Sequence, residues 1–125
     1  MITIDYQNRM PIYEQIVERF QMLIIKGILP SGSQMPSVRS LAVDLSINPN
    51  TIQKAYTVLE QQGYIFSVKG RGNFVADICT QITEKQRQCL SDLKDLLLYA
   101  RDLNISEAEC SSLLKETYHK EDSHD

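Results

Sequence analysis

The sequence lacks the features of a membrane or secreted protein. No apolar run reaches the length of about 18 residues that a transmembrane helix needs. The first ten residues, MITIDYQNRM, have neither the basic stretch nor the apolar stretch of a signal peptide. These absences predict a cytoplasmic protein with no membrane partner, and a hydrophobic content of 42% is enough for one modest core.

Cysteine is scarce, and its spacing is not that of a metal site. The three cysteines, Cys79, Cys89 and Cys110, are odd in number and contain no C-x-x-C pair, which argues against a disulfide framework and against a zinc finger. We expect them to be buried, reduced thiols. A thiol or metal sensor that combines them with His119 and His124 stays open as an alternative, but no cofactor is predicted.

The chain also has little positive charge, with a formal net charge of −3. Residues 1–77 hold seven Lys and Arg against six Asp and Glu, whereas residues 78–125 hold six against ten. The charge therefore divides the chain at about Asp77 into a nearly neutral half and an acidic half. If the first half binds nucleic acid, we expect it to use individually placed contacts and two copies acting together, because its general attraction for phosphate is weak.

The first helix of the neutral half is predicted to begin with Pro11 at its first helical position and to end near Gly27. Its apolar residues recur at helical spacing: Ile12, Ile16, Phe20, Leu23 and Ile24. The following stretch LPSGSQMPS contains prolines and glycine that disfavour helix, so we expect an irregular connector.

Two further short helices are predicted after the connector. The first covers about residues 37–45 with Ser37 as its N-cap, and the second has Asn48 as its cap, Pro49 at its first position and Gly63 after its end. Each has an apolar stripe: Val38, Leu41, Ala42 and Leu45 in the first, and Ile52, Ala55, Tyr56 and Leu59 in the second. Two amphipathic helices joined by so short a turn are typical of a helix-turn-helix.

The residues after Gly63 predict a β-hairpin. Two β-prone runs, residues 64–68 and 73–76, flank KGRG, whose glycines permit a tight connection. Helix, helix-turn-helix and hairpin in this order make a winged helix. The predicted fold class is therefore α+β, mainly α, with a winged helix-turn-helix followed by a two-helix dimerisation tail.

The acidic half predicts two more helices, at about residues 83–103 and after a capping box formed by Ser106 and Glu109. Their apolar band is too wide to leave exposed on a monomer, so it either covers the winged-helix core or pairs two chains, and we favour pairing. The candidate dimerisation residues are Leu90, Leu93, Leu96, Leu97, Ala100, Leu113 and Leu114. We expect a winged-helix DNA-binding domain at 1–77 and a dimerisation segment at 78–125.

The candidate DNA contacts follow from the buried stripe of the third helix, which turns its polar residues outward. Asn and Gln can form paired hydrogen bonds with adenine in the major groove, and Lys can reach guanine or phosphate. The start of the second helix can hold a phosphate, and a basic hairpin tip can approach the DNA backbone. The candidates are Ser37, Arg39, Asn48, Asn50, Thr51, Gln53, Lys54, Lys69, Gly70 and Arg71. Each could instead be an ordinary cap or a solvated surface residue, and only the order of the elements favours DNA binding.

Four stretches together resemble the GntR family of bacterial transcription regulators: PIYEQIVERF, GILPSGSQMPSVRSLAVDL, INPNTIQKAYTVLEQQGYI and KGRGNFV. They cover about residues 5–76, and NPNTIQKAY with a tail of only two helices looks most like the YtrA-type branch. The resemblance implies a homodimer that binds an inverted-repeat operator in double-stranded DNA, usually as a repressor and often near genes for membrane transporters. Carried over by position, it implies DNA contacts from Arg39, Asn48, Asn50, Gln53, Gly70 and Arg71.

The chain departs from the family pattern at two places that matter for the operator. Many relatives have arginine where Pro49 and Gln53 stand, so the operator sequence is not transferable from them. Larger members have an effector-binding or aminotransferase-like domain after the position of Asp77. Residues 78–125 are too few for such a domain, and the small-molecule effector stays unknown.

Two other classes of function compete with this hypothesis. A protein-interaction module would use the winged helix as a scaffold and the acidic helices as a docking surface. An enzyme is disfavoured, because the sequence contains no recognisable pair of nucleophile and base, and no catalytic or metal-binding residue is predicted.

Overall fold

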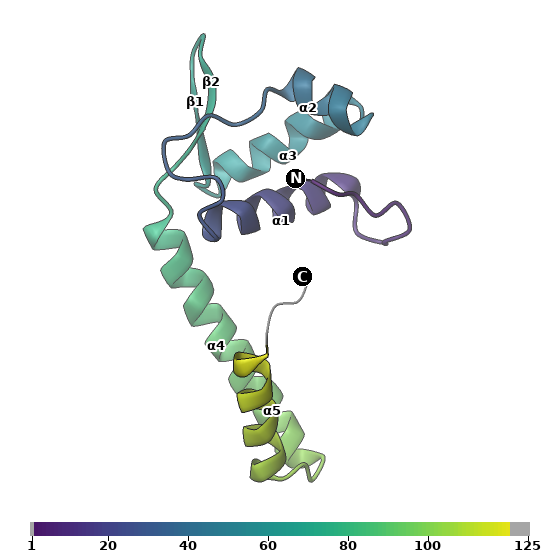
Figure 1. Cartoon of the computed structure of the whole chain (residues 1–125), viewed down its shortest axis with the longest axis vertical. Helices are drawn as coiled ribbons and strands as arrows, with labels where there is room; N and C mark the ends of the chain where they lie inside the picture. The colour runs from purple at the N-terminus through teal and green to yellow at the C-terminus, as the bar shows by residue number, and fades with distance from the viewer. Residues whose placement is uncertain (1, 121–125) are drawn as a thin grey trace. The chain divides into compact units, whose positions relative to one another are not determined.

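The computed structural model describes residues 2–120. Its elements, in order, are α1 (Ile12–Ile25), α2 (Val38–Leu45), α3 (Pro49–Gln61), β1 (Ile65–Val68), β2 (Gly72–Val75), α4 (Cys79–Asp102) and α5 (Glu107–His119) (Figure 1). The chain divides near Thr83 into two compact units. Within the described residues, no helix is long and apolar enough to cross a membrane.

The first unit is a winged helix, as expected from the sequence. α3 packs against both α1 and α2, and lies between them in Figure 1. The core of this unit consists of Ile16, Val17, Phe20, Ile24, Met35, Leu41, Ala42, Ile52, Ala55, Tyr56, Leu59, Tyr64, Ile65, Val75 and Ile78. The rings of Phe20 and Tyr56 meet edge to face at a centroid distance of 5.8 Å, which joins α1 to α3 at its centre.

The start of α1 differs from the prediction by one residue. Pro11 is the N-cap and not the first helical residue, because its ψ of 148° is extended. The side chain of Gln15, which is buried, accepts a hydrogen bond from the Asp5 amide and donates to the carbonyls of Asp5 and Met10. This one side chain therefore holds the N-terminal loop against the helix.

The predicted caps of the helix-turn-helix are confirmed. The Ser37 hydroxyl accepts a hydrogen bond from the Ser40 amide in the first turn of α2, and the Asn48 side chain accepts one from the Asn50 amide, with Pro49 beginning α3. Between the helices, Ser46 has a left-handed φ of 55°, which reverses the chain in very few residues. These local signals fix where the second helix starts, so the sequence encodes the turn.

β1 and β2 form the predicted antiparallel hairpin, paired from Ile65 with Val75 to Val68 with Gly72. At its tip Gly70 has a φ of 78°, and the Arg71 amide closes the turn on the Val68 carbonyl at 2.9 Å. A left-handed backbone conformation at this position of a tight turn favours glycine.

The connector before α2 is more regular than predicted. The Met35 amide donates to the Asn73 carbonyl, and the Val75 amide to the Ser33 carbonyl, both at 2.8 Å. These bonds pair the connector with the edge of β2 that β1 leaves free, because backbone polar groups near a core need partners. β2 is thereby paired on both of its edges, with β1 on one and the connector on the other.

The second unit contains most of α4 and all of α5. α4 begins at Cys79, earlier than the predicted residue 83, because the Asp77 side chain accepts the Cys79 amide and starts the helix. The capping box of Ser106 and Glu109 at the start of α5 is confirmed. The functional boundary expected at residue 77 stays a prediction.

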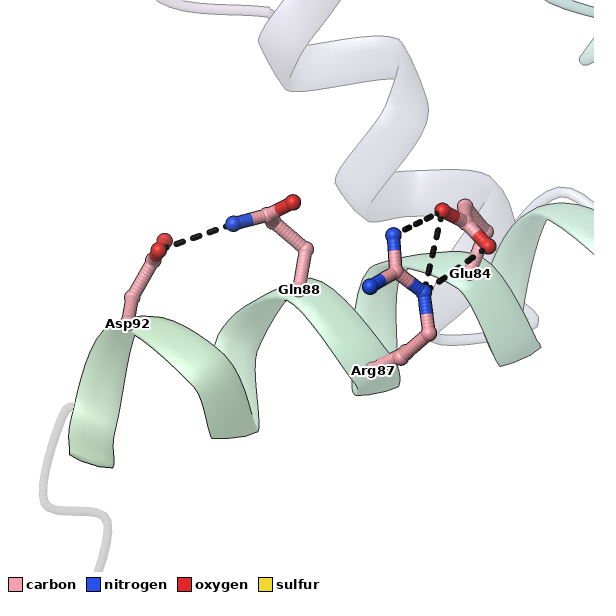
Figure 2. A network of polar contacts seen from close by, with 4 residues as sticks. All are labelled: Glu84, Arg87, Gln88 and Asp92. Carbon is pink, nitrogen blue, oxygen red and sulfur yellow. Dashed lines mark hydrogen bonds and ion pairs between the residues drawn. The ribbon is translucent and has the colours of Figure 1, made fainter. Parts of the chain in front are cut away.

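One face of α4 is polar, as Figure 2 shows. Arg87 forms an ion pair with Glu84, and the Gln88 amide donates to Asp92 at 2.9 Å. The two charged side chains are 64% and 65% exposed, so water screens the pair and it stabilises the helix little. Leu90, Leu93 and Leu97 lie on the opposite side of the helix.

The cysteines are not buried, contrary to the expectation from the sequence. Cys79 and Cys89 are exposed and Cys110 is half-buried, because α4 and α5 have no buried residue in this single chain. A hydrogen bond with Asp77 raises the pKa of the Cys79 thiol, which disfavours the reactive thiolate. Residues 2–120 bring no three His, Cys, Asp or Glu side chains together as a metal site, and His124 lies outside the described residues.

Candidate nucleic-acid interface

The rotation of α3 about its axis is fixed by its buried face. Its four buried side chains are no more than 1% exposed: Ile52, Ala55, Tyr56 and Leu59. The Tyr56 hydroxyl donates to the Pro36 carbonyl at 2.7 Å, and burial raises the pKa of Tyr56 well above its usual range. α3 therefore cannot turn without breaking this core, and Asn50, Gln53 and Lys54 stay exposed on its outer side.

The polar groups of α3 differ in what they can still bind. The Gln53 amide has only a long contact of 3.4 Å with the Thr57 hydroxyl, so both ends of its side chain are available to a base edge. Asn50 is exposed, and Thr51 is half-buried beside it. Asn48 is more restricted, because its side-chain oxygen already accepts the Asn50 amide at 2.8 Å and mainly its NH₂ group remains free.

Lys54 is held by an aromatic ring from α1. Its Nζ lies 4.0 Å from the centroid of the Tyr13 ring, within the range of a cation–π interaction. Ile12, Tyr13, Asn50, Thr51 and Lys54 line an open hollow between the first turns of α1 and α3. Tyr13 is not marked by any local sequence pattern, since only the packing of α1 on α3 brings this ring to the polar edge.

The candidates at the start of α2 are accessible. The Ser37 hydroxyl accepts the Ser40 amide at 3.0 Å, and its own proton is free to donate. Arg39 is exposed in the first turn, and in the part of the chain that the structure describes it has no carboxylate partner. A guanidinium next to the free amides of a helix start suits a phosphate.

The wing residues Lys69, Gly70 and Arg71 are exposed at the hairpin tip. The Gln34 side chain donates to the Arg71 carbonyl at 2.9 Å, so the connector supports the tip from the side. A Cβ at Gly72 would lie 3.2 Å from the same Gln34 amide nitrogen. Gln34 is not marked by any local pattern, because it lies in a stretch whose prolines and glycine predict irregular structure.

The three groups of candidates come from one compact unit. α2 and α3 pack together, and in Figure 1 the hairpin extends beyond them on the side away from α1. The arrangement combines amide groups for base edges with cations and free amides for phosphates, which are the two kinds of contact that a DNA-binding surface needs. The role of each residue in DNA contact stays a prediction.

The candidate dimerisation residues lie on the helices of the second unit and are exposed. The least and most exposed of the predicted leucines are Leu93 at 46% and Leu90 at 66%, and Ala100 is half-buried. Further large apolar residues on these helices and in the turn between them are also exposed: Leu98, Tyr99, Leu103, Ile105 and Tyr118. So many large apolar groups in contact with water are unfavourable for an isolated chain.

Comparison with known proteins identifies the family. The sequence model of the family described as bacterial regulatory proteins, gntR family, matches residues 12–75 of this chain. The HTH-type transcriptional repressor YtrA of Bacillus subtilis (strain 168) is 36% identical over 118 residues, which cover 93% of this chain and 91% of that protein. The chain belongs to the GntR family.

Solved structures of other proteins have the same fold as this chain. A transcriptional regulator from Oenococcus oeni has a TM-score of 0.76 at 26% identity, over 94% of this chain and 99% of that one. AraR(DBD) in complex with operator ORX1 has a TM-score of 0.55 at 29% identity, over 60% of this chain and 96% of that one. The chain is thus a DNA-binding transcription regulator, and its resemblance to the YtrA-type branch is confirmed.

Proposed function

We propose that the protein is a homodimeric repressor that binds an inverted-repeat operator. In each half-site α3 enters the major groove, the start of α2 binds a phosphate, and the wing contacts the flanking backbone. DNA binding is assigned to residues 1–77 and self-association to 78–125. Such a regulator acts on bacterial DNA in the cytoplasm, which is the compartment that the proposal implies.

The observation that carries the proposal is the fixed polar edge of α3. Asn50 and Gln53 lie near the start of a helix whose opposite face is fully buried. The start of the second helix in a helix-turn-helix is the part that reaches base edges. Repression is supported by the YtrA relative, a transcriptional repressor that matches this chain over most of its length.

The exposed band of α4 and α5 supports two copies. Its leucines have no buried partner within the described single chain, and a second copy can cover them with the same surface. A dimer places two recognition helices on one DNA, and their half-sites then lie about one helical turn, roughly 34 to 36 Å, apart. An inverted repeat is the sequence that matches such a two-fold arrangement.

DNA recognition is tested first by footprinting the full chain on the region upstream of its own gene, followed by titration of the protected duplex. Gln53→Ala is expected to relax base preference at a cost of about 1 to 3 kcal/mol. Gln61→Ala is the matched control, because Gln61 is an exposed glutamine at the other end of the same helix. Equal operator affinity of both variants and the parent would refute the assignment of α3 to the groove.

Self-association is tested separately by light scattering coupled to size exclusion. Leu93→Lys places a charge in the apolar band and is expected to give monomers that bind operator weakly. Gln88→Lys adds the same charge on the polar face of α4, where Asp92 can form an ion pair with it, and this variant should still be a dimer. A dimeric Leu93→Lys variant would show that this band is not the contact between copies.

A further inference from the structure

The contact between Tyr13 and Lys54 has a more specific meaning than packing. Tyr13 is half-buried on α1, and its hydroxyl donates to the Glu14 carboxylate at 3.2 Å. That hydrogen bond raises the pKa of Tyr13 further above neutral pH, where a phenol is already uncharged. The ring is therefore held in place at one edge while its face receives Lys54 at 4.0 Å.

This contact directs the lysine side chain. Lys54 follows Asn50 by one helical turn, so the two residues lie on the same side of α3. A free lysine on an exposed face samples many rotamers, and its ammonium could follow the groove edge along with Gln53. The Tyr13 ring instead keeps the Lys54 ammonium on the flank of α3 that faces α1, beside the open hollow that both residues line.

We propose that Lys54 contacts a backbone phosphate of the operator and not a base, and that Tyr13 is the positioning residue that holds it there. This inference rests on the proposed entry of α3 into the major groove. The flanks of a helix in that groove face the sugar–phosphate walls, whereas its leading edge faces the bases. In a helix-turn-helix protein, the helix packed beside the recognition helix runs close to the backbone.

The chemistry of the pair fits a phosphate. The ring face attracts the ammonium through its quadrupole without accepting a proton or neutralising the charge. The N–H groups that point away from the ring remain available to an anion, and lysine binds phosphate as a point charge. A side chain already held in place loses less conformational freedom on binding, so Tyr13 increases affinity without touching DNA.

The test is a double-mutant cycle on the full chain. The variants are Tyr13→Leu, Tyr13→Phe, Lys54→Met and the combination of Tyr13→Leu with Lys54→Met. The probes are a labelled duplex selected from a random library by the parent protein and a scrambled duplex of equal length, each titrated over a series of salt concentrations. Lys54→Met is expected to weaken both duplexes alike and to reduce the salt slope by about 1 per recognition helix.

The tyrosine variants give the sharper result. Tyr13→Leu should weaken binding by about two- to fivefold per recognition helix, and Tyr13→Phe, which keeps the ring face, should bind as the parent does. In the Lys54→Met chain, Tyr13→Leu should have no further effect. An equal loss in both lysine backgrounds would show that Tyr13 acts through folding alone and would overturn the proposal.

A measurement on the free protein checks the contact itself. The ring current of Tyr13 should shift the ε-methylene protons of Lys54 upfield in NMR spectra, and Tyr13→Leu should abolish this shift while Tyr13→Phe keeps it. A selective loss of the selected duplex in Lys54→Met would assign Lys54 to a base and contradict the phosphate role. Gln53→Ala distinguishes a failure of this inference from a failure of the proposed function. If Gln53→Ala relaxes base preference while the effects of Tyr13→Leu and Lys54→Met are additive, α3 lies in the groove and only the Tyr13 inference fails.

Discussion

Two buried tyrosines in the same core allow one prediction with an internal control. The Tyr56 hydroxyl, on a side chain 1% exposed, donates to the Pro36 carbonyl at 2.7 Å. The Tyr64 hydroxyl, on a side chain 2% exposed, has no hydrogen-bond partner among the described residues. Phenylalanine removes only the hydroxyl in each case, so the two substitutions differ in whether a hydrogen bond is lost.

The expected magnitudes follow from that difference. Tyr56→Phe loses a hydrogen bond and leaves the Pro36 carbonyl to be satisfied by water, which should cost about 1 to 2 kcal/mol of unfolding free energy. Tyr64→Phe removes a buried polar group that has no partner, so it should be neutral or stabilise the protein by up to about 1 kcal/mol. Pro36 directly precedes the Ser37 cap, so the Tyr56 bond also ties α3 to the start of α2.

The assay is equilibrium urea unfolding at pH 7, at several protein concentrations so that any association is accounted for. Tyr56→Phe should lower the midpoint with an unchanged slope, and Tyr64→Phe should not lower it. Equal losses in the two variants would refute the reasoning, because they would show that the hydroxyls contribute through something other than the hydrogen bond that distinguishes them.

Three further predictions concern the same unit. Burial raises the pKa of Tyr56 above 10.0, so above about pH 10 only the unfolded chain ionises at this residue, and the free energy of unfolding should fall by about 1.4 kcal/mol per pH unit. Urea unfolding from pH 9 to 11.5 should show a shallower fall of this free energy in Tyr56→Phe than in the parent. Gln15→Ala should cost about 2 to 3 kcal/mol and expose the loop amides, including that of Asp5, to hydrogen exchange, because three hydrogen bonds are lost. Gly63→Ala should cost about 1 to 2 kcal/mol of unfolding free energy, because the φ of Gly63 is 82°, and its new Cβ would also clash with the Gln81 side chain. Adding Gln81→Ala to the same chain should remove the clash but leave the backbone strain, and thermal unfolding of the two variants measures the difference.

The elements that the sequence predicts well are those with local signals. The side chains of three residues predict helix starts, and each lies at a helix start in the structure: Ser37, Asn48 and Pro49. The burial of Ile52 and Leu59 follows from helical periodicity alone. Because these positions fix both the ends and the rotation of α3, its outward polar edge was predictable before any tertiary contact was known.

The features that the sequence missed depend on residues far apart in the chain. Tyr13 meets Lys54 only because α1 packs on α3, and Gln34 supports Arg71 only because the connector pairs with β2. Neither partner has a local pattern that marks it. The cysteines were mispredicted for a related reason: a preference for burial becomes actual burial only where a neighbouring element covers the residue, and Cys89 on α4 has no such cover in the single chain.

The low positive charge links the two ends of the proposed mechanism. Among the candidate DNA contacts, each copy has four cations: Arg39, Lys54, Lys69 and Arg71. Since non-specific binding comes from neutralised phosphates, one copy with so few of them holds DNA weakly at physiological salt. In the proposed mode of binding, base contacts from Gln53 discriminate between sequences but cannot retain the protein alone. In the proposed dimer, a second copy joined through the leucines of α4 and α5 doubles both kinds of contact on one duplex, which gives the acidic tail a role in DNA binding by a chain whose net charge is negative.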